Sequence, residues 1–170
     1  MSTIEAVLGD ITAERTDAIV NAANSSLLGG GGVDGAIHAS AGPELYEACR
    51  RLRATSLPDG LGVGAAVATD AYRLPCRWVI HTVGPNAHRG QTDPALLASC
   101  FSSCLDAAVK LGAGSIAFPA ISAGIYGWDA EDVARIAVDA VRQHPKPGID
   151  LVRFVLFGDP VYQAFEHAVA

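Results

Sequence analysis

The chain alternates short apolar runs of strand length with helical segments from one end to the other. The runs are apolar at successive positions rather than at every second one, which is typical of strands covered on both faces. Such strands lie in a central sheet with a layer of helices on each side. The pattern therefore predicts a three-layer α/β/α fold, with a short first strand that ends at Val7-Leu8 and further strands at 18–20, 65–69, 78–83, 115–119 and 151–157.

Start signals for three helices follow these runs. Asp93 before Pro94 is typical of an N-cap with proline in the first helical turn, and Asp159 before Pro160 repeats the arrangement. Asp129 is expected to cap a further helix. The loops between each strand and the next helix are the places where such folds bind their ligands.

Half of the 170 residues are hydrophobic, so residues 1–170 can form one domain whose core needs neither disulfides nor a structural metal. Cys100 and Cys104 share a helix face and are expected to be small core residues. The histidines form no ligand-spaced cluster with the cysteines, so we expect no metal site and no cofactor. No apolar run approaches the ~20 residues of a membrane span, and residues 1–9 lack the features of a secretory signal. We therefore expect a cytoplasmic monomer with no membrane partner.

The charge balance argues against a nucleic-acid partner. The net charge is −6, and the only lysines are Lys110 and Lys146. Arg50, Arg51 and Arg53 lie close together in a helical stretch, where we expect them to form a solvated face. Nucleic-acid binding needs a basic surface that this chain does not offer. An anionic ligand would therefore be held mainly by backbone amides.

The segment 21–38 contains the most specific pattern. It begins with Asn-Ala-Ala-Asn after a buried strand, passes through four successive glycines at 29–32, and enters a helix at Val33-Asp34-Gly35. Glycines let the backbone approach a ligand closely, and the helix N-terminus behind them favours an anion. The segment lacks the lysine of a P-loop and the glycine spacing of a dinucleotide fingerprint. These absences disfavour a nucleoside triphosphatase and a nicotinamide dehydrogenase.

A second loop of small residues, 120–127, follows the strand 115–119 and precedes the helix capped by Asp129. Two amide-rich loops facing one crevice suit a diphosphate. Tyr126 adds an aromatic face to this loop, although its residue type also suits simple packing. We expect ligand binding because the two loops occur together.

Two residues elsewhere allow two interpretations each. Asp10, after the first strand, is either a cap for the next turn or a carboxylate that accepts a hydrogen bond from an exocyclic amine. Phe157, at the end of the last strand, is either a core residue or a ring that stacks on a base.

Three motifs, Gly9-Asp10-Ile11-Thr12, the segment 21–38 and the loop 122–127, closely resemble the macrodomains, specifically the MacroD type. The similarity runs in order from about residue 5 to residue 165. It implies a mixed, mainly parallel central sheet with ADP-ribose in a cleft at its top. In that cleft Asp10 would accept from the adenine amino group with help from the Ile11 amide, and Phe157 would flank the adenine.

The resemblance also assigns the remaining binding residues. Amides of Gly32 and Val33 would bind the phosphates on one side. The loop that closes over them would consist of Ser122, Ala123, Gly124, Ile125 and Tyr126, with Tyr126 against the distal ribose. Asn24 would bind the distal ribose hydroxyls and Asp34 would lie beside the scissile bond, as the catalytic pair. His38, four residues after Asp34 and on the same helix face, is either a supporting residue of the site or a structural histidine.

MacroD-type proteins remove ADP-ribose from acidic side chains and deacetylate O-acetyl-ADP-ribose, and both reactions cleave an ester. The resemblance thus implies a hydrolase whose partners are ADP-ribose, ADP-ribosylated proteins and O-acetyl-ADP-ribose. A module that reads ADP-ribose without hydrolysis is the alternative, which Asn24 and Asp34 argue against. Water attack on the acyl carbon and on the anomeric carbon both remain open.

The expected chemistry of Asp34 is that of a weak base. An aspartate has an ordinary pKa of about 3.9, and a helix N-terminus lowers it further. We therefore expect Asp34 to orient a water and the distal ribose, with a ligand phosphate oxygen sharing the proton transfer. The chain departs from the family pattern at Trp128-Asp129, where an aromatic residue and proline are common, and this change bears on rate and substrate preference.

Overall fold

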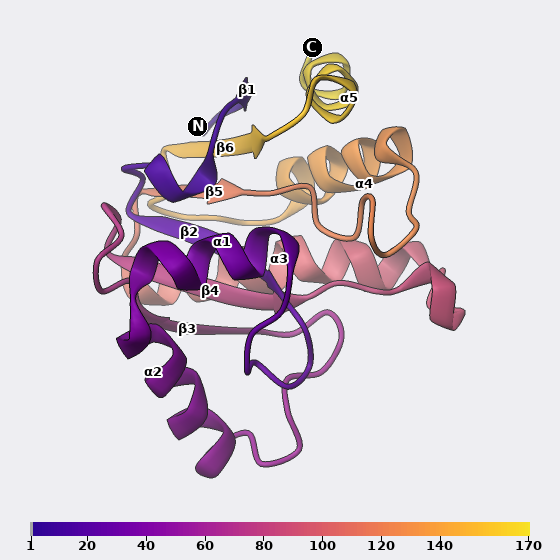
Figure 1. The fold of residues 1–170 in the computed structure, drawn as a ribbon. Helices are drawn as coiled ribbons and strands as arrows, with labels where there is room; N and C mark the ends of the chain where they lie inside the picture. Colours follow the sequence, from indigo (N-terminus) through magenta and orange to yellow (C-terminus); the bar gives the residue numbers. More distant parts are fainter. Residues whose placement is uncertain (1) are drawn as a thin grey trace.

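A six-stranded sheet forms the centre of the molecule in a computed structural model, which describes residues 2–170. The strand order is β1-β6-β5-β2-β4-β3, and every neighbouring pair is parallel except β3 with β4 (Figure 1). The strands are β1 (Thr3–Leu8), β2 (Ala18–Ala23), β3 (Ala66–Asp70), β4 (Trp78–Val83), β5 (Ser115–Phe118) and β6 (Leu151–Leu156).

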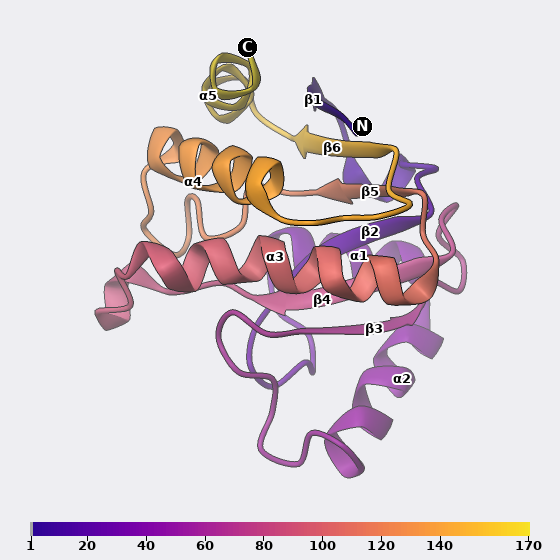
Figure 2. The same cartoon turned by 180° about the vertical axis from the view of Figure 1, so that it is seen from behind.

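Helices cover both faces of this sheet. One face carries α1 (Gly32–Ala41) and α2 (Pro43–Ala54), and the other carries α3 (Pro94–Leu111), α4 (Ala130–Gln143) and α5 (Asp159–Val169) (Figures 1 and 2). Two short 3-10 helices, η1 (Ile11–Ala13) and η2 (Ala87–Arg89), follow β1 and β4. The predicted α/β/α fold with a mixed, mainly parallel sheet is confirmed.

The larger core lies between the sheet and helices α3, α4 and α5. Its centre is a group of four buried rings, Phe101, Phe118, Phe154 and Phe165, with neighbouring centroids 5.0–6.2 Å apart. Helix α3 is long and apolar enough to cross a membrane by length and composition alone. Its inward face, which includes Cys100 and Cys104, is buried against this core, as in a helix of a globular protein.

Most of the local predictions hold, but one helix cap and several strand ends differ. Asp93 caps α3 by accepting from the Ala95 amide, and Asp129 caps α4. The prediction that Asp159 caps the final helix is wrong, because Gly158 takes the extended N-cap conformation and Asp159 lies in the first turn. The last strand ends at Leu156, one residue before the predicted end.

The topology places four strand ends at one edge of the sheet. Strands β1, β6, β5 and β2 run parallel in neighbouring positions, so their carboxyl ends lie side by side. The loops that leave these ends therefore converge, which is where folds of this kind bind ligands.

Candidate functional site

A cleft of about 670 Å³ opens at this edge of the sheet. Its walls come from the loops after β1, β2, β5 and β6. Every residue predicted to bind substrate lines it: Asp10, Ile11, Asn24, Gly32, Val33, Asp34, Ser122, Ala123, Gly124, Ile125, Tyr126 and Phe157. His38 lies behind Asp34 and does not line the cleft.

The glycine run forms one wall and the start of α1. Gly31 is the N-cap, and no side chain caps the helix, so the amides of its first turn are available to a ligand. Gly32 has a φ of 58°, a conformation that glycine adopts without strain. A methyl group on Gly30 would approach Asn24 Nδ2 to 3.2 Å and Asp34 Oδ2 to 3.3 Å, so a side chain at this position would crowd both.

The loop after β5 forms the facing wall. Ser122 is buried with a φ of 71°, and its hydroxyl donates to the carbonyl of Pro85 at 2.8 Å. The Gly127 amide donates to the Gly124 carbonyl at 2.9 Å, which folds the loop back on itself. A methyl group on Gly32 would lie 3.7 Å from Ile125 Cδ1, so the two loops come close together across the cleft.

The far end of the cleft contains Asp10 and Phe157. Asp10 Oδ1 accepts from the amide and the hydroxyl of Thr12, at 2.9 and 2.7 Å, and so caps η1. Both bonds use Oδ1. Within residues 2–170 no group donates to Oδ2, so this oxygen is open to a ligand. Phe157 is 88% exposed and is therefore not a core residue.

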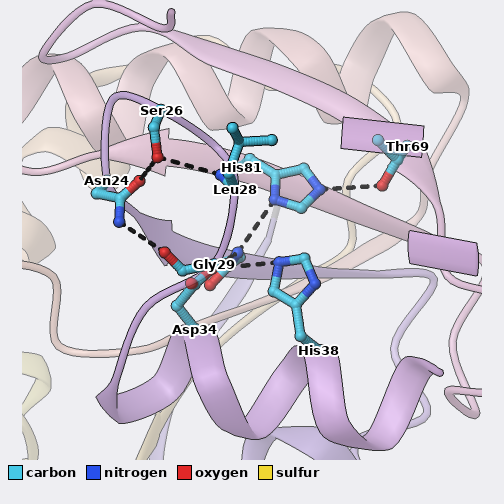
Figure 3. A network of polar contacts seen from close by, with 9 residues as sticks. Asn24, Ser26, Leu28, Gly29, Asp34, His38, Thr69 and His81 are labelled. Atoms are coloured by element: carbon cyan, nitrogen blue, oxygen red, sulfur yellow. Dashed lines mark hydrogen bonds and ion pairs between the residues drawn. The ribbon is translucent and has the colours of Figure 1, made fainter. Parts of the chain in front are cut away.

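Asn24 closes the loop that precedes the glycines. Its Nδ2 donates to the Gly29 carbonyl at 2.8 Å, and its Oδ1 accepts from the Ser26 hydroxyl at 2.6 Å (Figure 3). Arg53 braces the same loop, because its guanidinium donates to the Ser26 carbonyl at 2.9 Å. The prediction of a solvated face at Arg50, Arg51 and Arg53 is thus wrong for Arg53, which also donates to two carbonyls after α2.

Asp34 is buried at the first turn of α1, and only one of its oxygens is hydrogen-bonded. Oδ1 accepts from Asn21 Nδ2 at 2.7 Å and lies 3.5 Å from His38 Nε2. Oδ2 is buried beside Gly30 with no partner among residues 2–170. Because Asp34 lines the cleft, Oδ2 is an acceptor that remains open to a donor there.

The charge state of Asp34 follows from these contacts. Burial by itself raises the pKa of the carboxyl, but the hydrogen bonds from His38 and Asn21 outweigh it and leave the pKa below its ordinary value. The direction of the pKa shift agrees with the prediction, but its causes are side-chain hydrogen bonds, whereas the prediction rested on the helix N-terminus. Asp34 is therefore a carboxylate at neutral pH.

Sequence reasoning missed the side chains behind Asp34. Asn21 and His81 are fully buried in β2 and β4, and Asn21 Nδ2 lies 3.1 Å from His81 Nδ1. A histidine inside an apolar strand was the available signal, since a buried polar group needs a partner. Among residues 2–170 there is no group of three His, Cys, Asp or Glu side chains that could hold a metal ion.

Comparisons of the sequence and of the structure with known proteins point to the same family. The family model described as the macro domain matches residues 20–137. A macro domain-containing protein of Streptomyces griseus is 56% identical over 167 residues, covering 98% of this chain and 94% of the relative. The structure is similar to that of the Oceanobacillus iheyensis macrodomain with ADP, at a TM-score of 0.90, 43% identity and coverage of 96% and 88%. It is also similar to the Trypanosoma brucei macrodomain in complex with ADP-ribose, at a TM-score of 0.86, 38% identity and coverage of 97% and 69%.

The burial of His81 predicts a specific loss of stability in acid. Burial and the neighbouring His38 lower the pKa of His81 to about 4, against a partial opposing effect of Asp34. In the unfolded chain His81 has an ordinary pKa of about 6.5, so it binds a proton at a pH where the folded protein keeps it neutral. The free energy of unfolding therefore decreases as the pH falls from about 6.5 to 4. Between pH 7 and pH 5 we expect the free energy of unfolding to fall by about 2 kcal/mol through His81.

Urea unfolding of the wild type and of His81→Asn at both pH values measures this contribution. The variant lacks the titrating ring and should lose correspondingly less stability over the same interval. Equal losses in the two proteins would show that His81 is not the group responsible.

Proposed function

The chain belongs to the macro domain family, and we propose that it binds ADP-ribose and hydrolyses ADP-ribosyl esters. The substrates would be proteins mono-ADP-ribosylated on acidic side chains, and O-acetyl-ADP-ribose. One observation carries the proposal: Asp34 is a buried carboxylate whose Oδ2 has no partner among residues 2–170, and this oxygen and Asn24 Nδ2 both lie beside Gly30 of the glycine run. A ribose hydroxyl or a water in the cleft would supply the missing donor.

The shape and chemistry of the cleft support this ligand. Amides at the start of α1, and those of Ser122, Gly124, Ile125 and Tyr126 in the facing loop, would hold the diphosphate without lysine. Asp10 Oδ2 would accept from the adenine amino group, and the exposed ring of Phe157 would stack on the base. The distal ribose would then lie at the end where Asn24 and Asp34 meet.

The proposed reaction adds water across the ester and releases ADP-ribose and a carboxylic acid. A carboxylate with a lowered pKa is a weak base, so Asp34 would act by orienting the water and the ribose. A phosphate oxygen of the substrate would share the proton transfer. Orientation of this kind lowers a barrier by as much as about 7–11 kcal/mol in ideal cases. Attack at the acyl carbon and attack at the anomeric carbon give the same products.

A second candidate function is an ADP-ribose reader without hydrolytic activity. The observation in its favour is that both ends of the Asn24 amide already have partners, Gly29 and Ser26, inside the loop. These bonds leave one hydrogen on Nδ2 and one lone pair on Oδ1, so Asn24 can anchor a ribose hydroxyl while it stays fixed in the loop, as a reader requires. Incubation with a glutamate-linked ADP-ribosylated protein and with O-acetyl-ADP-ribose separates the two functions, because only the hydrolase releases free ADP-ribose.

We expect free ADP-ribose to bind and to raise the melting temperature. A ligand that binds only the folded state stabilises it by mass action, about 2.7 kcal/mol at one hundred times the dissociation constant. Calorimetry and thermal unfolding in a ligand titration measure both effects. The absence of heat and of a thermal shift at millimolar ADP-ribose would remove the basis of the proposed function.

Asp10→Asn should lose adenine selectivity while keeping the fold. Asparagine caps a helical turn as well as aspartate does, so the bonds to Thr12 should survive. The lost charge-assisted hydrogen bond to the adenine amine should weaken binding by roughly 1.5–3 kcal/mol. Affinities for ADP-ribose and for its inosine analogue measure the selectivity, and Asp10→Ala is the control that removes the cap as well. If Asp10→Asn keeps the preference for ADP-ribose, Asp10 serves only as a cap.

Asp34 and Asn24 should differ in how they affect binding and hydrolysis. Asp34→Ala should slow ester hydrolysis at least about tenfold, or 1.4 kcal/mol of barrier. Its affinity for ADP-ribose should change less, or even increase, because a charge near two phosphates has been removed. Asn24→Ala should impair both, because it loses contacts made in ground and transition states alike.

Single-turnover hydrolysis together with calorimetric affinity for the wild type and both variants tests this assignment. Hydrolysis by Asp34→Ala at the wild-type rate would contradict it. A wild type that binds tightly but releases no ADP-ribose would favour the reader function instead.

A further inference from the structure

A line of polar side chains, half-buried at Thr69 and buried beyond it, runs from the edge of the sheet to Asp34. Thr69 lies on β3, His81 on β4 and Asn21 on β2, so the line crosses three neighbouring strands beneath α1. We propose that Thr69, His81 and Asn21 are positioning residues that fix the direction of the Asp34 carboxylate. The inference rests on the proposed function for its effect on rate, and on the contacts alone for its effect on Asp34.

The contacts form an unbroken chain. Thr69 Oγ1 lies 3.0 Å from His81 Nε2, His81 Nδ1 lies 3.1 Å from Asn21 Nδ2, and Asn21 Nδ2 lies 2.7 Å from Asp34 Oδ1. Asn21 and His81 face each other as register partners in the parallel β2–β4 pair. Figure 3 shows His81 between Thr69 and Asp34. The sheet itself therefore sets the spacing of the chain.

The direction of every hydrogen bond follows from the charge at its end. An ionised Asp34 only accepts, so the Asn21 amide must turn its nitrogen toward it. The second hydrogen of that nitrogen then needs an acceptor, which makes His81 Nδ1 the unprotonated nitrogen. His81 is thus neutral with its proton on Nε2, from which it donates to Thr69. A charged His81 would place an N–H against the N–H of the Asn21 amide and break this hydrogen bond of the network.

The same arrangement explains why the amide oxygen of Asn21 has no partner. Asn21 Oδ1 is buried without a partner among residues 2–170, because both hydrogens of Nδ2 are used and the amide cannot turn round. The hydrogen-bond network thus keeps Asn21 Nδ2 on Asp34 Oδ1 and leaves Asn21 Oδ1 without a donor. Oδ2 remains the oxygen available to substrate. Removal of the His81 acceptor would free the Asn21 amide to rotate and would leave Asp34 Oδ1 with His38 alone among the side chains of residues 2–170.

Two substitutions of His81 separate its two nitrogens. His81→Asn places an oxygen where Nδ1 lies and keeps the acceptor for Asn21. His81→Gln places its amide group near Nε2 and loses that acceptor. Thr82→Val is the structural control, because Thr82 is equally buried on β4. Its hydroxyl donates to the Ala65 carbonyl and makes no hydrogen bond with the side chains of the network among residues 2–170.

We expect His81→Gln to lower the single-turnover rate at least about tenfold, with ADP-ribose affinity nearly unchanged. His81→Asn should retain most of the rate, and Thr82→Val should lose stability only. In an Asp34→Ala background, His81→Gln should cause no further loss, because positioning residues act through the group they position. Equal rate losses in the two His81 variants, or an additional loss in the Asp34→Ala background, would overturn the proposal.

Nuclear magnetic resonance tests the positioning role without any hydrolysis. Nitrogen shifts of His81 should show the neutral ring with its proton on Nε2. The pKa of the Asp34 carboxyl, followed by carbon shifts, should rise in His81→Gln and stay unchanged in His81→Asn. A proton on Nδ1, or the same Asp34 pKa in both variants, would overturn the inference even if the wild type proves to be a reader. Inactivity of the wild type with the expected shifts would instead count against the proposed function alone.

Discussion

A buried negative charge is the constraint on which the rest of the site depends. An ionised carboxylate in a protein interior is stable only with good donors, because desolvation is costly. Asp34 receives its donor from Asn21 in the strand beneath and lies near His38 one turn further along α1. These contacts tie the first helix to the second strand. They also explain why Gly30 is needed, since a side chain there would enter the space between Asn24 and Asp34.

The two facing walls of the cleft are built from the backbone instead of from charge. The chain has two lysines, and Lys146 is used to bond the Val141 carbonyl near the end of α4. Phosphate groups would therefore meet amides, which stay available because no side chain caps α1. The amides at the start of α1 belong to a helix that packs against β2, so this part of the site is in place before binding and little ordering is left to oppose affinity.

The parts of this structure that could be predicted from sequence were those with a local cause. Apolar runs predict buried strands, and Asp93 and Asp129 predict caps because the capping bond lies within three residues. The glycine run and the loop 122–126 could be placed at one cleft because parallel strands end at one edge. The network behind Asp34 could not, because it joins Asn21, His81 and Thr69 across three strands whose order the sequence does not contain. Arg53 was missed for the same reason, since its partner Ser26 is distant in sequence.

The departure from the family pattern at Trp128-Asp129 adds a carboxylate to the loop, but the hydrogen bonds of Asp129 hold this charge at the start of α4. Asp129 Oδ2 accepts from the amides of Glu131 and Asp132, so its charge sits at the start of α4, where the helix dipole favours it. Trp128 packs against the large core, and its amide donates to the Ser122 carbonyl at 3.3 Å. These bonds hold the loop in the turn that Ser122 and Gly124 begin with positive φ angles. The loop thus holds Ile125 beside Gly32 without a proline, because core packing of Trp128 and helix capping by Asp129 together fix its C-terminal end.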